Sequence, residues 1–211
     1  MSIDYRVLRY EILLAQMPMP VYNVGKTRRD SMNEIVRAIM ERYSCRDFLP
    51  EPLPKEQVNI LIDAALASPS ALNLQPWHII AVTDKALIDA MDEYAMSDEN
   101  MPFYERIKER GGKMFYNAPC VLVIAIDDTE RAPLDAGIVS QNICLAAHSL
   151  ELGSCICGMM RIPLEGEKGK DFIKKLKIPE GMKFGMSVLV GKVKTPKAPH
   201  ELDKSKVTYV S

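Results

Sequence analysis

One stretch of the chain, residues 136–150, contains no Asp, Glu, Lys or Arg. Apolar and small side chains fill it, and its few polar residues are spread too widely to form a solvent-facing stripe. A helix of this kind is buried, either in the centre of a domain or at a contact between subunits. The stretch therefore predicts a helix over residues 135–150 that is buried on most sides, at one of these two places.

Shorter patterns predict further elements around this helix. Residues 58–66 carry apolar side chains at helical spacing. Ser31 and Glu34 form a capping-box pattern at the start of an earlier helix, which puts Ile39 and Arg42 on an inward-facing stripe. The predicted strands, each apolar and bounded by Pro, Gly or Asp, cover residues 79–82, 121–126 and 186–193.

Composition narrows the class of protein. Over 211 residues, 27 Lys and Arg nearly balance 28 Asp and Glu, so no overall field favours a nucleic acid or a membrane surface as partner. We find no apolar run of the roughly 18 residues that a membrane span needs and no secretion signal. Five cysteines, an odd number, predict a reducing compartment, by default the cytoplasm. We interpret residues 1–30 as an N-terminal extension or arm and residues 31–211 as a single domain.

Two arginines flank a serine in the segment RYSCR, residues 42–46, at the predicted exit of a helix. Guanidinium groups make paired, charge-assisted hydrogen bonds to phosphate oxygens, so the segment suits an anion. Capping of the helix C-terminus by cations explains the same residues without a ligand, and the local sequence slightly favours that interpretation. Both remain open on this segment alone.

The segment ASPSALNLQPW, residues 67–77, is longer than an ordinary connection and has no charge. Ser70, Asn73 and Gln75 offer donors and acceptors that suit the edge of a flat heterocycle. A solvated connector is the alternative. Trp77 leads directly into a strand and is predicted to anchor the core.

The segment GSCICGMM, residues 153–160, follows the uncharged helix. Cys155 and Cys157 are a lone C-x-C pair, which is weak evidence for zinc or for dithiol redox chemistry. Small residues that let a backbone approach a ligand are the preferred interpretation. No catalytic triad, HExxH motif or Walker loop accompanies them.

In order and spacing, these segments resemble the FMN-dependent nitroreductase family over about residues 33–195. The matching motifs are RYSCR followed by DF, the ASPSALNLQPW loop, DAG in the uncharged helix, LGSCICGMM and IPEG. The resemblance implies an α+β fold with a central, mostly antiparallel sheet flanked by helices. It also implies an intertwined homodimer with FMN at the subunit interface.

The resemblance further implies which residues bind FMN, with a backbone amide of Gly158 or Met159 facing flavin N5. Family members often have an aromatic residue where Ile156 stands, and a Lys or Arg pair where this chain has Lys197 and His200. The implied residues are Arg42, Tyr43, Ser44 and Arg46 at the phosphate and ribityl chain; Pro69, Ser70, Ala71, Leu72, Asn73 and Gln75 from the other subunit; Ile156, Cys157, Gly158 and Met159 along the ring; and Lys197 and His200 at the phosphate.

The implied activity is transfer of reducing equivalents from NADH or NADPH, through the flavin, to a nitroaromatic, a quinone or a similar small acceptor by a ping-pong mechanism. No metal and no catalytic side chain is required, because the flavin carries the chemistry, while Arg46 near the pyrimidine edge stabilises the reduced state. Relatives with this scaffold also perform reductive dehalogenation or flavin cleavage. A non-flavin protein that uses Cys155 and Cys157 for thiol redox or metal binding is the competing class.

Overall fold

The computed structural model describes residues 33–98 and 103–210. Two units divide the chain, Met1–Arg37 and Ala38–Ser211, and the sheet and cavities described below belong to the second. The predicted arm over residues 1–30 and the capping residue Ser31 lie outside the described residues, so the boundary at residue 31 stays a prediction. No helix in the described ranges combines the length and the apolar character needed to cross a bilayer.

A four-stranded sheet forms the centre of this unit, in the order β1-β2-β4-β3, and every neighbouring pair is antiparallel. Its strands are β1 (Trp77–Val82), β2 (Cys120–Ile126), β3 (Gly153–Ile156) and β4 (Lys183–Gly191). All seven residues of β2 are buried, because helices cover both faces of the sheet. The structure confirms the predicted antiparallel sheet and three of its strands; β3 was not predicted.

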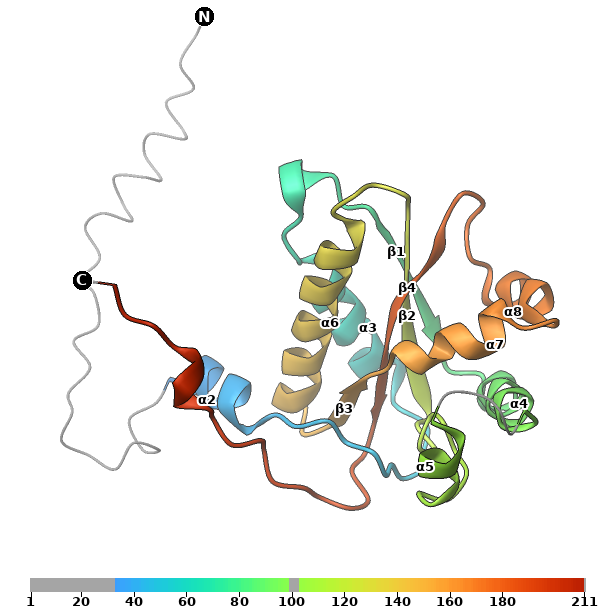
Figure 1. Ribbon diagram of the computed structural model, residues 1–211, viewed down its shortest axis with the longest axis horizontal. Coiled ribbons are helices and arrows are strands. Elements are labelled where there is room, and N and C mark those ends of the chain that lie inside the picture. The colour runs from blue at the N-terminus through green and yellow to red at the C-terminus, as the bar shows by residue number, and fades with distance from the viewer. Residues whose placement is uncertain (1–32, 99–102, 211) are drawn as a thin grey trace, which may run out of the picture. The chain divides into compact units, whose positions relative to one another are not determined.

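Alternate side chains of β2 point to opposite faces and enter two separate cores. Leu122 and Ile124 pack with helices α3 and α6, whereas Val121 and Val123 pack with helices α4, α5, α7 and α8 (Figure 1). The helices and short 3-10 turns are α2 (Glu34–Glu41), α3 (Lys55–Leu66), η1 (Ala71–Asn73), α4 (Lys85–Met96), α5 (Tyr104–Lys108), α6 (Ala132–Ser149), η2 (Gly158–Met160), α7 (Arg161–Glu165), α8 (Gly169–Leu176) and η3 (Lys204–Lys206).

Helix α6 is the uncharged helix, but only one of its faces is buried in a single chain. Val139 and Ile143 pack on the sheet, whereas Leu134 is 71% exposed and Ile138 is 40% exposed on the opposite side. The prediction of burial on most sides is therefore wrong for one chain, because the second face has no helix over it. Of the two original interpretations, an uncovered apolar face fits a subunit contact.

The predicted inward stripe of α2 is also wrong for a single chain. Ile39 is 49% exposed, and α2 contains no buried residue. Apolar spacing identified the helix correctly, but spacing alone does not say whether the covering surface comes from the same chain.

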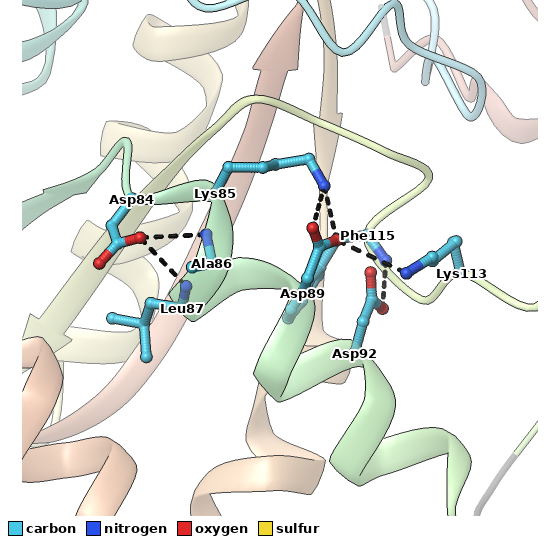
Figure 2. Close-up of polar contacts among 8 residues, drawn as sticks. All are labelled: Asp84, Lys85, Ala86, Leu87, Asp89, Asp92, Lys113 and Phe115. Atoms are coloured by element: carbon cyan, nitrogen blue, oxygen red, sulfur yellow. Dashed lines mark hydrogen bonds and ion pairs between the residues drawn. The ribbon is translucent and has the colours of Figure 1, made fainter.

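Helix α4 anchors the segment that leads into β2 (Figure 2). Asp92 is 1% exposed, and its Oδ1 accepts a hydrogen bond of 3.0 Å from the amide of Phe115. Burial raises the pKa of Asp92 to about 6, although the Phe115 amide and the charge of Lys113 oppose the shift. One turn away, Asp89 is paired with Lys85 at 2.5 Å and with Lys113 at 3.5 Å.

We expect Asp92→Asn to remove a pH-dependent destabilisation. The folded-state pKa lies above the ordinary value of 3.8, so the group's contribution to stability is complete below pH 3.8 and is lost as the pH rises through about 6. This shift of two pKa units corresponds to about 3 kcal/mol. In urea denaturation, the free energy of unfolding of the wild type should fall by that amount relative to Asp92→Asn between about pH 4 and pH 8.

Asp89→Asn is the matched control, because its difference from wild type in free energy of unfolding should change with pH in the opposite direction. Burial alone would raise the pKa of Asp89, but the hydrogen bond and charge of Lys85 and the charge of Lys113 lower it below the usual value. The wild type should therefore gain stability over Asp89→Asn as the pH rises from acid. A pH-independent difference for Asp92→Asn would show that this carboxyl group is not perturbed.

Candidate functional site

The RYSCR segment runs beside β3, which fixes the direction of its side chains. The amide of Cys45 donates a hydrogen bond of 2.9 Å to the carbonyl of Ser154, and Ser44 and Ser154 form a parallel bridge. Extended backbone sends successive side chains to opposite sides. Cys45 is therefore buried in the core while its neighbours Ser44 and Arg46 face outward.

These outward side chains meet the C-terminal segment in a cavity of about 270 Å³, which we call the arginine–serine pocket. The cavity is lined by Arg42, Tyr43, Ser44, Arg46, Lys197, Ala198, Pro199 and His200. The structure thus brings together all six residues that the sequence assigned to a phosphate and ribityl chain, although about 150 positions separate the two segments. Of the residues that the structure describes, three cations and no carboxylate line this space.

Arg42 has a hydrogen-bond donor without an acceptor among the described residues of this pocket. Its Nε atom is buried and has no hydrogen-bond partner within the part of the chain that the structure describes. A buried donor without an acceptor is costly, and more so when the donor is charged. An anion with several acceptor oxygens fits this donor set, whereas a helix-capping role leaves the Nε atom unexplained.

Two further cavities lie next to each other and share Phe103 and Met159. We call the larger one, of about 480 Å³, the apolar cavity; it is lined by Phe103, Gly158, Met159, Arg161, Ile162, Phe184, Gly185 and Met186. The smaller one, of about 170 Å³, is the three-arginine pocket; it is lined by Arg46, Phe103, Arg106, Ile107, Arg110, Tyr116 and Met159. Arg46 also lines the arginine–serine pocket, so the three spaces are linked through shared residues.

The GSCICGMM segment lies at the wall of the apolar cavity because β4 holds it. The Cys157 amide donates to the carbonyl of Ser187 at 2.8 Å, and the Ser187 hydroxyl donates to the carbonyl of Cys157 at 2.6 Å. Burial raises the pKa of the Cys157 thiol, and the nearby amides of Met159 and Met160 oppose that shift. A Cβ atom at Gly158 would meet only the Met186 sulfur, 4.0 Å away.

The thiols of this segment face the core rather than a ligand. Cys155 and Cys157 are each 3% exposed, and burial raises the pKa of Cys157 to about 12 and also raises that of Cys155. Both are protonated at neutral pH, so neither supplies the thiolate that redox exchange or metal binding requires. No cluster of three metal-ligating side chains occurs in residues 33–98 or 103–210. Ile156 is 38% exposed and lines none of these cavities.

The ASPSALNLQPW loop has an unusual backbone conformation. Leu72, Asn73 and Gln75 have φ values of 53°, 54° and 48°, although none is glycine. Left-handed backbone at such residues costs about 1 kcal/mol or more each. Leu72 is 91% exposed in spite of this cost, whereas Trp77 is 7% exposed and anchors the core as predicted.

Helix α6 holds this loop through two residues that sequence reasoning missed. Asp135 Oδ1 accepts a hydrogen bond of 3.4 Å from the amide of Ala71, and Asn142 Nδ2 donates one of 2.9 Å to the hydroxyl of Ser68. Asp135 is buried at the start of the uncharged stretch. A buried carboxylate needs a polar partner, and this requirement was the available signal.

The loop and the RYSCR segment lie near opposite ends of α6 (Figure 1). Asp135 contacts the loop near one end, while His148 near the other end lines a cavity of about 380 Å³ together with Arg42. Thirteen residues of α-helix span about 20 Å. One chain therefore does not bring the loop to its own pocket.

Solved structures of nitroreductases have a fold similar to that of this chain. A nitroreductase from Desulfitobacterium hafniense with bound FMN is 42% identical, with a TM-score of 0.80, and the match covers 85% of this chain and 100% of that one. An FMN-dependent nitroreductase from Clostridium difficile is 32% identical, with a TM-score of 0.70, over 84% of this chain and 99% of that one.

A curated relative from Bacillus subtilis, named FMN reductase [NAD(P)H], is 25% identical over 210 residues, which cover 85% of this chain and 76% of the relative. The model of the nitroreductase family matches residues 39–192, which include the RYSCR segment, the ASPSALNLQPW loop and all four strands. The chain belongs to the nitroreductase family.

Proposed function

We propose that this chain is an FMN-dependent oxidoreductase that takes reducing equivalents from NADH or NADPH and delivers them to a small acceptor such as a nitroaromatic or a quinone. The arginine–serine pocket is the observation that carries this proposal. Its cations and the unpartnered Nε atom of Arg42 fit a phosphate monoester, the terminal group of FMN. The FMN in the relative from D. hafniense and the nucleotide named for the B. subtilis reductase support the cofactor and the donor.

Each part of the site has its own task. Arg42, Ser44 and Lys197 hold the phosphate and ribityl chain, and Arg46 stands closer to the ring, because it also lines the three-arginine pocket. The amide of Gly158 or Met159 is the donor for flavin N5, since both residues line the apolar cavity. Bound FMN supplies hydride transfer in two separate half-reactions, reduction by nucleotide and reoxidation by the acceptor.

The apolar cavity suits both substrates of such a scheme. Phe103, Phe184 and Ile162 offer apolar surface for a planar ring, and the cavity opens beside Gly158. A ring held there excludes water from the reacting atoms, and no side-chain acid or base is required for hydride transfer. The free, buried cysteines suit a reducing compartment, and the cytoplasmic location stays a prediction.

The working form in this proposal is a homodimer. The loop of each chain reaches the arginine–serine pocket of its partner, because its own pocket lies at the far end of α6. Leu72 in the loop and Leu134 and Ile138 on α6 are exposed apolar side chains on uncharged surfaces, which a second copy covers. Two-fold symmetry then gives two equivalent flavin sites per dimer.

Leu72→Ser tests the partner contact, because Leu72 makes little contact within its own chain. Folding of one chain should be unaffected, whereas burial of a leucine at an interface contributes about 1.5–3 kcal/mol, and symmetry counts it twice. The dimer dissociation constant should rise by roughly 100-fold or more, with loss of retained FMN. Sedimentation velocity and flavin absorbance measure both effects.

Ile173→Ser is the matched control, since Ile173 on α8 is a 38% exposed apolar residue on the other side of the sheet. It should leave the dimer and the flavin content as in wild type. An unchanged dimer with full flavin content in Leu72→Ser would mean that no partner covers the loop.

The enzymatic proposal is tested by reconstitution. The purified chain should take up FMN, turn yellow, and be bleached by NADH or NADPH in the absence of oxygen; a panel of nitroaromatics and quinones should restore the colour. The product of each half-reaction should appear without the other substrate, as a ping-pong scheme requires. Failure to take up FMN, or flavin that neither nucleotide reduces, contradicts the proposed function.

A further inference from the structure

The three-arginine pocket contains more positive charge than flavin binding explains. Arg46 comes from the RYSCR segment, whereas Arg106 lies on α5 and Arg110 follows it by four residues. Among residues 33–98 and 103–210, no acidic side chain lines the pocket, and no ion pair within these ranges involves any of the three guanidinium groups. Arg110 lies in the turn that follows α5, and like charges that line one small pocket repel each other.

One side of the pocket fixes the geometry of an arginine. Tyr116 lines this pocket together with Arg46 and Arg110. Burial and the neighbouring thiols of Cys155 and Cys157 raise the pKa of Tyr116, and the two arginines oppose that shift. Asp92 in turn bonds the amide of Phe115, the preceding residue, so the wall that carries Tyr116 is anchored to α4.

The three-arginine pocket adjoins the apolar cavity, where the proposed function places the substrates. Phe103 and Met159 line both the three-arginine pocket and the apolar cavity, and Arg46 lines the arginine–serine pocket as well. With about 170 Å³, the pocket holds a small group rather than a whole ligand. A molecule whose ring lies in the apolar cavity therefore reaches the arginines with a substituent.

We propose that Arg46, Arg106 and Arg110 form an anion-binding subsite for a carboxylate or phosphate group of a substrate whose planar ring lies in the apolar cavity. The proposal rests on the proposed flavin function and adds a substrate class to it. Arginine forks match the oxygens of both groups, and Phe103, Ile107 and Met159 add apolar surface beside them. The anionic group has two sources, an acidic aromatic acceptor or a phosphate of the nucleotide donor.

Charge-removing variants of the FMN-loaded protein test the subsite: Arg106→Gln, Arg110→Gln and the double variant. With NADH as donor, kcat/KM is measured for 4-nitrobenzoate and for its neutral amide. With the neutral amide as acceptor, it is measured for NADPH and for NADH. If the subsite binds an acidic acceptor, the ratio of kcat/KM for 4-nitrobenzoate to kcat/KM for its amide should fall roughly 10-fold for each arginine removed. Each substitution loses a charge-assisted hydrogen bond to the carboxylate. A nucleotide phosphate predicts the same fall in the ratio of NADPH to NADH.

Lys108→Gln is the matched control, because it removes one positive charge from the same helix outside the pocket. The Lys108 Nζ atom lies 5.4 Å from the ring centroid of Tyr104. Lys108→Gln should leave both kcat/KM ratios within about twofold of wild type. A general effect of charge would instead change the ratios of all variants alike. Ratios that stay within this limit in the double variant overturn the subsite.

The same measurements separate this failure from failure of the underlying function. A wild type that takes up FMN and reduces the neutral amide, with no ratio changed in the double variant, contradicts only the subsite. A wild type that takes up no FMN contradicts the flavin function and the subsite together.

Discussion

Arg42→Ala should lower the affinity for FMN by at least about 100-fold, or roughly 3 kcal/mol, because it removes two or more charge-assisted hydrogen bonds to the phosphate. The stability of the flavin-free chain should change little, since the buried Nε atom of Arg42 has no partner among the described residues. Equilibrium dialysis of FMN gives the affinity, and urea denaturation of the flavin-free protein gives the stability.

Two comparisons sharpen this prediction. Arg42→Lys keeps the charge but loses the paired donors, so it should fall between wild type and alanine. Arg131→Ala removes an exposed arginine that lines none of the cavities and should bind FMN as wild type does. If Arg42→Ala instead binds FMN normally and loses stability, the arginine is a structural residue and the phosphate lies elsewhere.

Gly153→Ala should damage both the fold and the flavin site. A Cβ atom at Gly153 would lie 2.8 Å from Val193 Cγ2 and 2.9 Å from both Cβ and Sγ of Cys45, closer than packed atoms approach. Relief requires Cys45 to move away from β3, and the RYSCR segment moves with it. We expect a loss of about 1–3 kcal/mol of stability and a roughly 10-fold weaker binding of FMN.

A second substitution checks that crowding is the cause. Val193→Ala removes the nearest of the three atoms, so it should recover part of both losses in the Gly153→Ala background. Val193→Ala alone should only lose stability. Independent, additive effects of the two changes in a double-mutant cycle contradict the crowding explanation.

Strands that pack on helices of the same chain could be predicted well from their sequence patterns. Alternation and apolar runs identified β1, β2 and β4, because each is bounded by turn residues and packs on helices of its own chain. Strand β3 was not predicted because its sequence GSCI, Gly153–Ile156, is short and has small side chains. It pairs with β4 at the edge of the sheet. The pairing partners, not the local residues, make it a strand.

Some residues of the candidate site could likewise be predicted from the sequence, and others could not. Residues of the RYSCR segment and Lys197 were assigned through a family resemblance and meet in one pocket. Arg106 and Arg110 were not assigned, since arginines on a short charged helix and in the turn after it carry no local signal of convergence with Arg46. The sequence could not decide between the domain centre and a subunit contact for α6, because burial by a second copy would leave the same apolar pattern as burial by the chain itself.

Mixed dimers test most directly whether two chains share each flavin site. A chain with Arg42→Ala and a chain with Asn73→Ala, purified as a mixed dimer through two different tags, each carry one defect. If the pocket of one chain works with the loop of its partner, one site in the mixed dimer has both defects and the other has none. The account predicts one tightly bound FMN per mixed dimer, while both parent homodimers bind weakly. Weak binding at both sites of the mixed dimer would contradict it, because every site would then be built from a single chain.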